Sequence, residues 1–155
     1  MKQTDDFADL YQEVILDHGR HPRHGKRLEA FDVTAKGDNP MCGDRVQVWV
    51  KLDNGTIGAV GFEARGCAIS VASADLMVEA VQGRDPADTK ALFEAFRDMA
   101  RTGSCRHCAA ELEAPLERLA PLSGVHEYPS RVKCATLPWH ALIAALDGVK
   151  EATSE

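Results

Sequence analysis

The sequence predicts one α/β domain, because a β-hairpin pattern in its first half is flanked by stretches with helical periodicity and the length suits a single core. A chain of 155 residues buries roughly two thirds of its unfolded surface without crosslinks. Hydrophobic residues make up 45% and charged residues 27% of the sequence, which excludes a disordered chain, and no apolar run reaches the length of a membrane span. We therefore expect a single domain over residues 1–155.

The first predicted helix has apolar residues at positions 7, 10, 11, 14 and 15 and ends at Gly19 and Pro22. The basic stretch 18–27 follows, with histidines at positions 18, 21 and 24. Gly19 and Pro22 prevent one helical face from presenting all three histidines. We therefore favour a solvated basic loop, a candidate docking surface for an acidic partner, over a metal site.

Three segments have the character of strands. Residues 31–35 form a weak one, whereas residues 45–52 alternate clearly, with valines at every second position from 46 to 50. Asp53-Asn54-Gly55 is typical of a tight hairpin turn and leads into residues 57–64 as the antiparallel partner.

Three further helices are predicted after the hairpin. One has an apolar stripe from Ile69 to Ala80, and the next opens at Pro86 and ends at Gly103. The last is expected to have Thr136 as its N-cap and Pro138 in its first turn. The tail, residues 150–155, is expected to fray.

Cys105 and Cys108 stand between these helices, at the start of a short helical segment, and residues 121–130 look like a connector. Their C-x-x-C spacing suits an inert or oxidisable pair, an auxiliary metal or sulfur-handling site, or a structural link. The sequence leaves these alternatives open.

The charge and the beginning of the chain exclude several classes of function. A net charge of -6 disfavours a general nucleic-acid binder. The first six residues contain no apolar signal segment, so a cytoplasmic location is the default. Five cysteines in that setting favour metal ligands or nucleophiles over a disulfide framework.

Four residues make a candidate metal site. Cys42 and Asp44 are two residues apart, so an extended chain would place them on one face. Cys67 precedes a predicted helix, whose dipole and unpaired N–H groups stabilise a thiolate, although a small buried cysteine would fit there equally well. With Cys134, the set supplies three thiolates and a carboxylate, which suits tetrahedral zinc. Spacing alone leaves open whether the four converge.

Three segments carry a resemblance to a known family. Asn39-Pro-Met-Cys-Gly-Asp44, Gly66-Cys-Ala-Ile-Ser70 and Arg131-Val-Lys-Cys-Ala-Thr-Leu-Pro-Trp139 resemble, in order and approximate spacing, the three cysteine motifs of the IscU/NifU-type iron-sulfur cluster assembly proteins. The resemblance implies an IscU/SufE-like α/β (α+β) fold, with a small antiparallel sheet of about three strands covered by helices.

Within that family the chain is most similar to the SufU branch. Lys133 stands where scaffold-type members typically have a histidine, and residues 128–133 replace their Leu-Pro-Pro-Val-Lys chaperone-recognition segment. Residues 102–123 look like the insertion that marks the SufU branch. Cys105 and Cys108, which lie inside it, are not part of the family pattern.

The resemblance implies a zinc-dependent sulfurtransferase acting in iron-sulfur cluster assembly. Zn2+ would be held by Cys42, Asp44, Cys67 and Cys134, and Cys42 would receive persulfide sulfur from a SufS-type cysteine desulfurase, released for this by a partner histidine. A downstream iron-sulfur assembly scaffold would take the sulfur. Two alternatives remain open: a scaffold that assembles a [2Fe-2S] cluster on the same ligands, and an activator of the desulfurase in which zinc only braces the fold.

Overall fold

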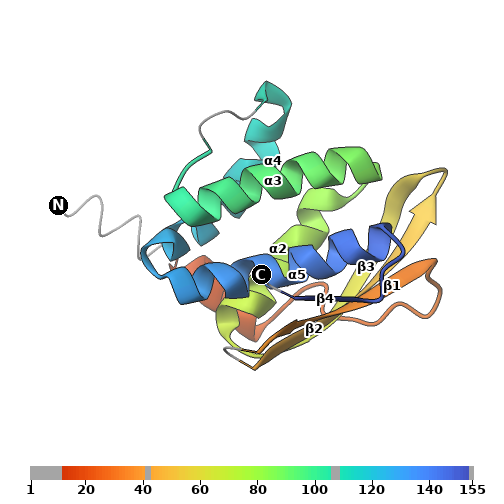
Figure 1. Ribbon diagram of the computed structural model, residues 1–155, viewed down its shortest axis with the longest axis horizontal. Coiled ribbons are helices and arrows are strands. Elements are labelled where there is room, and N and C mark those ends of the chain that lie inside the picture. The colour runs from red at the N-terminus through yellow and green to blue at the C-terminus, as the bar shows by residue number, and fades with distance from the viewer. Residues whose placement is uncertain (1–11, 41–42, 106–108, 154–155) are drawn as a thin grey trace.

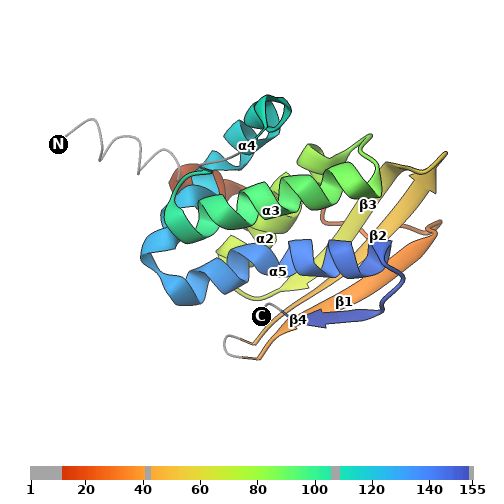
Figure 2. The same ribbon diagram turned by 45° about the horizontal axis from the view of Figure 1, so that its top comes forward.

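The computed structural model describes residues 12–40, 43–105 and 109–153. Its strands form one sheet in the order β3-β2-β1-β4. Helices α2 (Ala68–Val81) and α5 (Pro129–Leu146) pack on one face of this sheet, and α3 (Pro86–Thr102) packs on α5 as a further layer (Figures 1 and 2). The predicted α/β fold, with a small sheet covered by helices, is confirmed.

The three long strands are antiparallel neighbours: β1 (Val33–Asn39), β2 (Asp44–Asp53) and β3 (Thr56–Arg65). The predicted hairpin turn lies between β2 and β3. Asn54 and Gly55 both have positive φ, 52° and 82°, as a turn that matches the twist of the two strands requires. The weak strand predicted at residues 31–35 begins two residues later and runs on to Asn39.

A fourth strand corrects the prediction that residues 150–155 fray. β4 (Glu151–Thr153) pairs with β1 in parallel, in register from Lys36 opposite Glu151. The Lys36 backbone N–H also donates to the Lys150 carbonyl at 2.8 Å. Three residues are too few to show an alternating pattern, so no strand is predicted here from periodicity.

The basic stretch that follows the first helix crosses the other face of the sheet. A Cβ placed on Gly61 would lie 2.2 Å from the Lys26 carbonyl oxygen, so only glycine allows this approach. The Arg27 guanidinium lies 5.4 Å from the ring centroid of Trp49, whose side chain is buried although it points away from the helices. Residues 26–28 therefore form a strap over the sheet, while Lys26 and Arg27 stay exposed to solvent as predicted.

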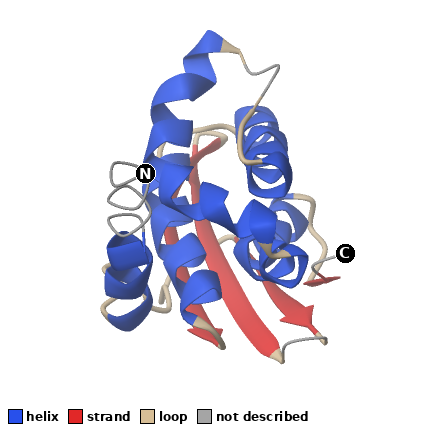
Figure 3. Ribbon diagram, turned by 90° about the vertical axis from the view of Figure 1, so that its left-hand side faces the viewer, coloured by secondary structure: helices blue, strands red, loops and turns tan. Residues whose placement is uncertain are grey.

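The first helix is described from residue 12 to residue 20, and its predicted apolar residues at positions 7, 10 and 11 lie outside the described part (Figure 3). His18 at its end contacts Asp75, which is fully buried on α2. The backbone N–H of His24 donates to the second oxygen of the same carboxylate at 2.8 Å. Asp75 thus ties the end of the first helix and His24 to α2, so the exposed basic loop is anchored at two of its histidines.

From residue 110 on, the predicted insertion folds into short helices that lie against α3. The sequence of elements is η1 (Ala110–Leu112), α4 (Glu113–Leu119) and η2 (Ala120–Glu127), with Leu116, Leu119 and Leu122 buried. The connector predicted at 121–130 is therefore helical over most of its length. No helix in the described ranges is long and apolar enough to cross a membrane.

Cys105 is disulfide-bonded, whereas Cys67 and Cys134 are free thiols. Of the alternatives left open for the C-x-x-C motif, a disulfide at Cys105 agrees with an oxidisable pair or a structural link. Cys108 lies outside the described residues.

Candidate metal centre

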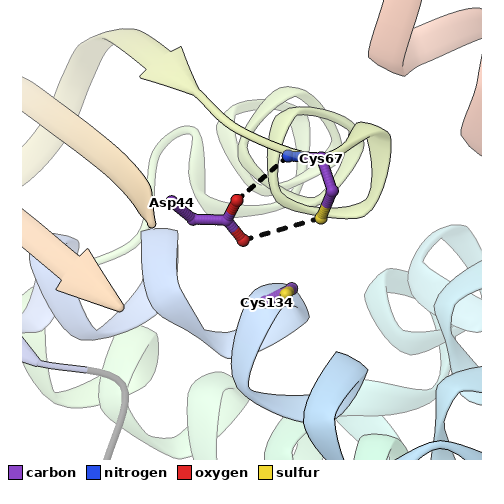
Figure 4. A group of neighbouring side chains, drawn as sticks. All are labelled: Asp44, Cys67 and Cys134. Carbon is purple, nitrogen blue, oxygen red and sulfur yellow. Dashed lines mark hydrogen bonds between the residues drawn. The ribbon is translucent and has the colours of Figure 1, made fainter. Parts of the chain in front are cut away.

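Three of the four predicted ligands converge on one point (Figure 4). Asp44 is the first residue of β2, Cys67 is the N-cap of α2, and Cys134 lies in the second turn of α5. Their donor atoms all lie within 4.8 Å of one another. Asp44 is 2% exposed and Cys134 is fully buried, while Cys67 is half-buried, so the group opens to solvent on the Cys67 side.

The Asp44 carboxylate is fixed by donors on the first turn of α2. The backbone N–H of Cys67 donates to one oxygen at 3.0 Å, and the Ser70 hydroxyl lies 2.8 Å from the other. Burial acts to raise the pKa of Asp44, but hydrogen bonds from Cys134, Ser70 and Cys67 outweigh it and lower the pKa below its ordinary value. The carboxylate is therefore ionised and held ready to bind a cation.

Gly66 makes the approach of Asp44 to α2 possible. Its φ is +144°, a region that other residues avoid, and a Cβ at this position would lie 2.0 Å from Oδ1 of Asp44. Glycine is thus required before Cys67, because any other residue would strain the backbone and its Cβ would collide with the Asp44 carboxylate.

Cys67 lies at the helix start, as predicted. It is the N-cap of α2, whose first turn contains no acidic residue and no capping hydrogen bond from the Cys67 side chain. A hydrogen bond from the Cys134 thiol, opposed by burial and helped by Ser70, lowers the pKa of Cys67 to about 6. The neighbouring Cys67 sulfur and burial in turn raise the pKa of Cys134 above its ordinary value. Without a metal, Cys67 is the thiol that ionises at neutral pH.

The position of Cys134 corrects the predicted start of the last helix. α5 begins at Pro129, and Thr136 and Pro138 lie inside it. Proline has no N–H, so Pro138 gives no hydrogen bond to the carbonyl four residues earlier, which is that of Cys134. The Ser70 hydroxyl lies 3.1 Å from this carbonyl oxygen and takes the place of the missing donor.

Ser70 is therefore a site residue that the sequence reasoning missed, although it belongs to the second motif. Its side chain is 1% exposed and contacts all three candidate ligand residues: the Asp44 carboxylate, the Cys134 carbonyl and, at 3.8 Å, the Cys67 sulfur. The signal available in the sequence was the proline four residues after Cys134.

Two further polar side chains face the sulfur atoms. Nδ2 of Asn39, at the end of β1, lies 3.9 Å from Sγ of Cys134. A hydrogen bond to Cys134 and the charge of Cys67 raise the pKa of Arg131 above its ordinary value. The exposed guanidinium of Arg131 thus places a permanent positive charge beside the thiols.

Cys42 lies outside the described residues. The extended chain assumed between Cys42 and Asp44 is wrong at Gly43, where φ is +74° and the backbone N–H donates to the Asn39 carbonyl at 2.8 Å. The Gly43 backbone thus bonds back to the end of β1, and β2 begins at Asp44.

A second group, His18, Asp75 and Glu79, also brings ligand atoms within 4.8 Å of one another. Both oxygens of Asp75 are already engaged, one by His18 and one by the backbone N–H of His24. Nε2 of His24 lies 3.4 Å from Glu79. These contacts account for the group as a tether between elements.

The first group suits a metal better. Two thiols and one ionised carboxylate, buried and gathered from three elements, are the donor types of zinc and of thiolate-bound clusters. Such a small α/β domain, with a thiolate-rich centre at one end of its sheet, defines a class of metal- or cluster-handling proteins.

The comparisons with known proteins agree with this class. A family model described as the NifU-like N-terminal domain matches residues 10–135, and the chain belongs to this family. It is 36% identical over 133 residues to the zinc-dependent sulfurtransferase SufU of Bacillus subtilis, covering 86% of each chain. It is 37% identical over 138 residues to the iron-sulfur cluster assembly scaffold protein IscU of Streptococcus pyogenes, covering 88% of this chain and 82% of the relative.

A solved structure supports the same conclusion. The crystal structure of an iron-sulfur cluster assembly scaffold protein of the SUF system from Fervidobacterium islandicum AW-1 superposes with a TM-score of 0.75 at 30% identity, covering 86% of this chain and 94% of that one. The predicted resemblance to the IscU/NifU-type proteins, and within them to SufU, is confirmed. Iron-sulfur cluster assembly is the function that this membership supports.

Proposed function

We propose that this chain is a zinc-dependent sulfurtransferase, which accepts persulfide sulfur from a SufS-type cysteine desulfurase and passes it to a downstream iron-sulfur assembly scaffold. The observation that supports this most directly is the convergence of Asp44, Cys67 and Cys134 on one buried point. A relative named as a zinc-dependent sulfurtransferase is 36% identical to the chain.

The proposed zinc ligands are these three residues and Cys42, and Cys42 is the proposed sulfur acceptor. The chain itself keeps the Cα atom of Cys42 within about 7.6 Å of that of Asp44, because only two peptide units separate them. Zinc supplies a charge that keeps the thiols deprotonated at neutral pH while damping their reactivity.

The proposed transfer is a thiol–disulfide type of exchange. The thiolate of Cys42 attacks the outer sulfur of the desulfurase persulfide, a new S–S bond forms on Cys42, and the desulfurase cysteine leaves as a thiolate. The step consumes no oxidant and no reductant. Arg131, whose guanidinium lies beside the thiols, offsets the negative charge of the thiolates at the site.

Titration of a cysteine desulfurase with this protein, with and without a zinc chelator, tests the partner, the metal and the activity together. We expect the protein to stimulate alanine release and to gain one sulfur at Cys42, detected by mass spectrometry of the digested protein. Cys42→Ala abolishes both signals, while Cys105→Ala, a cysteine outside the site, keeps them. Stimulation that survives in Cys42→Ala would contradict sulfur transfer and favour a role as an activator of the desulfurase.

The second candidate is a scaffold that holds a [2Fe-2S] cluster on the same ligands. The 37% identity to a relative named as an iron-sulfur cluster assembly scaffold favours it. Protein isolated without oxygen separates the two functions. About one zinc per chain and no visible absorption support sulfur transfer, whereas a coloured, iron-loaded protein supports the scaffold.

A further inference from the structure

A pocket lies between α3, η2 and α5, with a volume of about 270 Å³. Five basic side chains line it, and they come from all three elements. No Asp or Glu of the described residues lines the pocket. The basic residues are Arg97 and Arg101 of α3, His126 of η2, and Lys133 and His140 of α5.

This pocket is separate from the candidate metal centre. Its walls include Val132 and Thr136 of α5, each two residues from Cys134. At 100° per residue, two positions correspond to about 200° around a helix, so these residues and Cys134 lie on opposite faces of α5. None of Asp44, Cys67 and Cys134 lines the pocket.

The pocket is lined by basic side chains although the chain as a whole has a net charge of -6. Arg97 has one carboxylate neighbour, the exposed Glu94 at 3.8 Å on its own helix. Over the described ranges, Arg101 and Lys133 have no carboxylate within 4.0 Å. Like charges brought together in a concave site repel one another and create a potential that attracts an anion.

The charge of the two arginines also acts on a histidine of the pocket, His140. Burial first, and then the charges of Arg97 and Arg101, lower the pKa of His140 to about 4, so both guanidinium groups act on its ring. The ring also stands edge-on to Phe93, with centroids 5.0 Å apart. Nδ1 of His126 lies 2.8 Å from the Ser123 carbonyl oxygen and therefore carries the proton. Nε2 is the other polar atom of that ring.

We propose that this pocket binds a phosphate group, either as inorganic phosphate or as the phosphoryl group of a small metabolite. Two arginine side chains and a lysine are the set that proteins use for phosphate oxygens, because guanidinium groups pair with them in a bidentate manner. A volume of 270 Å³ lies just below the range of about 300–1,000 Å³ typical for drug-sized ligands, so the pocket suits a small anion better than a large cofactor.

NMR titration of the full-length protein tests the proposal, with inorganic phosphate and AMP as probes and sodium chloride at matched ionic strength as the reference. We expect saturable shifts of the His126 and His140 ring signals with phosphate, and none with chloride. Arg101→Gln weakens phosphate binding about tenfold, the loss expected for one charge-assisted hydrogen bond. Arg118→Gln, a matched exposed arginine on α4, leaves the affinity unchanged.

The two probes distinguish the source of the phosphate. AMP binding more tightly than phosphate indicates a phosphorylated metabolite, and equal affinities indicate free phosphate. Shifts that do not saturate, that chloride reproduces, or that Arg101→Gln leaves unchanged overturn the proposal. The metal centre does not enter this experiment, so its outcome is independent of the proposed sulfur transfer.

Discussion

Replacing Ser70 with alanine removes the hydroxyl that joins Asp44 to the backbone of α5. The hydroxyl lies 2.8 Å from the Asp44 carboxylate and 3.1 Å from the Cys134 carbonyl. A hydrogen bond to a charged group contributes about 1.5–3 kcal/mol, and a buried carbonyl left without a partner costs about 1–3 kcal/mol. The hydroxyl has a single proton to share between the two acceptors, so we expect a total loss of about 2–4 kcal/mol in the free energy of unfolding.

Ser73→Ala is the matched control. Ser73 is also buried on α2, and its hydroxyl also donates to a carbonyl of α5, that of Ala135. Four residues after Ala135 comes Trp139, which has a backbone N–H for that carbonyl. Loss of the Ser73 hydroxyl therefore costs only about 0.5–1.5 kcal/mol.

Chemical denaturation of the metal-free variants measures these differences, and the melting temperature is expected to fall by about 2–4 °C per kcal/mol for a chain of this size. The double variant Ser70→Ala, Pro138→Ala restores an N–H opposite the Cys134 carbonyl. It should therefore show a favourable coupling of about 1 kcal/mol or more in a double-mutant cycle. Equal costs for Ser70→Ala and Ser73→Ala, with no coupling to position 138, would refute this reasoning.

Three further predictions concern the site and its supports. Gly66→Ala forces a Cβ to within 2.0 Å of the Asp44 carboxylate. It should destabilise the protein by about 1–3 kcal/mol from backbone strain alone and reduce bound zinc in metal analysis; a fully loaded, stable variant would contradict this. In the metal-free protein, alkylation of Cys67 by iodoacetamide should rise with pH around a midpoint near 6, since its pKa is lowered to about 6; a midpoint near 8.5, the value of an ordinary cysteine, would show that the thiol is unperturbed. Asp75→Ala removes the acceptor that holds the first helix and His24, and should cost about 1–3 kcal/mol in urea unfolding. Glu79→Ala, which removes a half-exposed carboxylate, should cost less than about 1 kcal/mol, and equal costs would be evidence against the tether.

The parts of the fold that were predicted correctly depend on local patterns. The alternating valines of β2 and the Asn54-Gly55 turn identify the hairpin within ten residues of chain. The proline at the start of α3 and the glycine at its end mark both ends of that helix. β1 continues through Gly37, which packs closely on Leu137 and Ala141. This long-range contact cannot be read from a local sequence pattern.

The start of α5 was missed for a physical reason. A proline usually marks the first turn of a helix, so Pro138 predicts a helix start, although it lies in the middle of α5. The hydrogen bond that Pro138 cannot give is replaced by one from Ser70, a residue 68 positions earlier in the sequence. The convergence of Asp44, Cys67 and Cys134 likewise depends on long-range packing, and without the family resemblance the residue types alone did not determine it.

The pairing of β4 with β1 has a consequence for self-association. β1 would otherwise be an edge strand whose free N–H and C=O groups could pair with another molecule, and the last described residues of the chain cover part of that edge. Deleting residues 150–155 would uncover it. The shortened protein is therefore expected to form larger species at high concentration, visible by light scattering, even while its thiol cluster stays assembled.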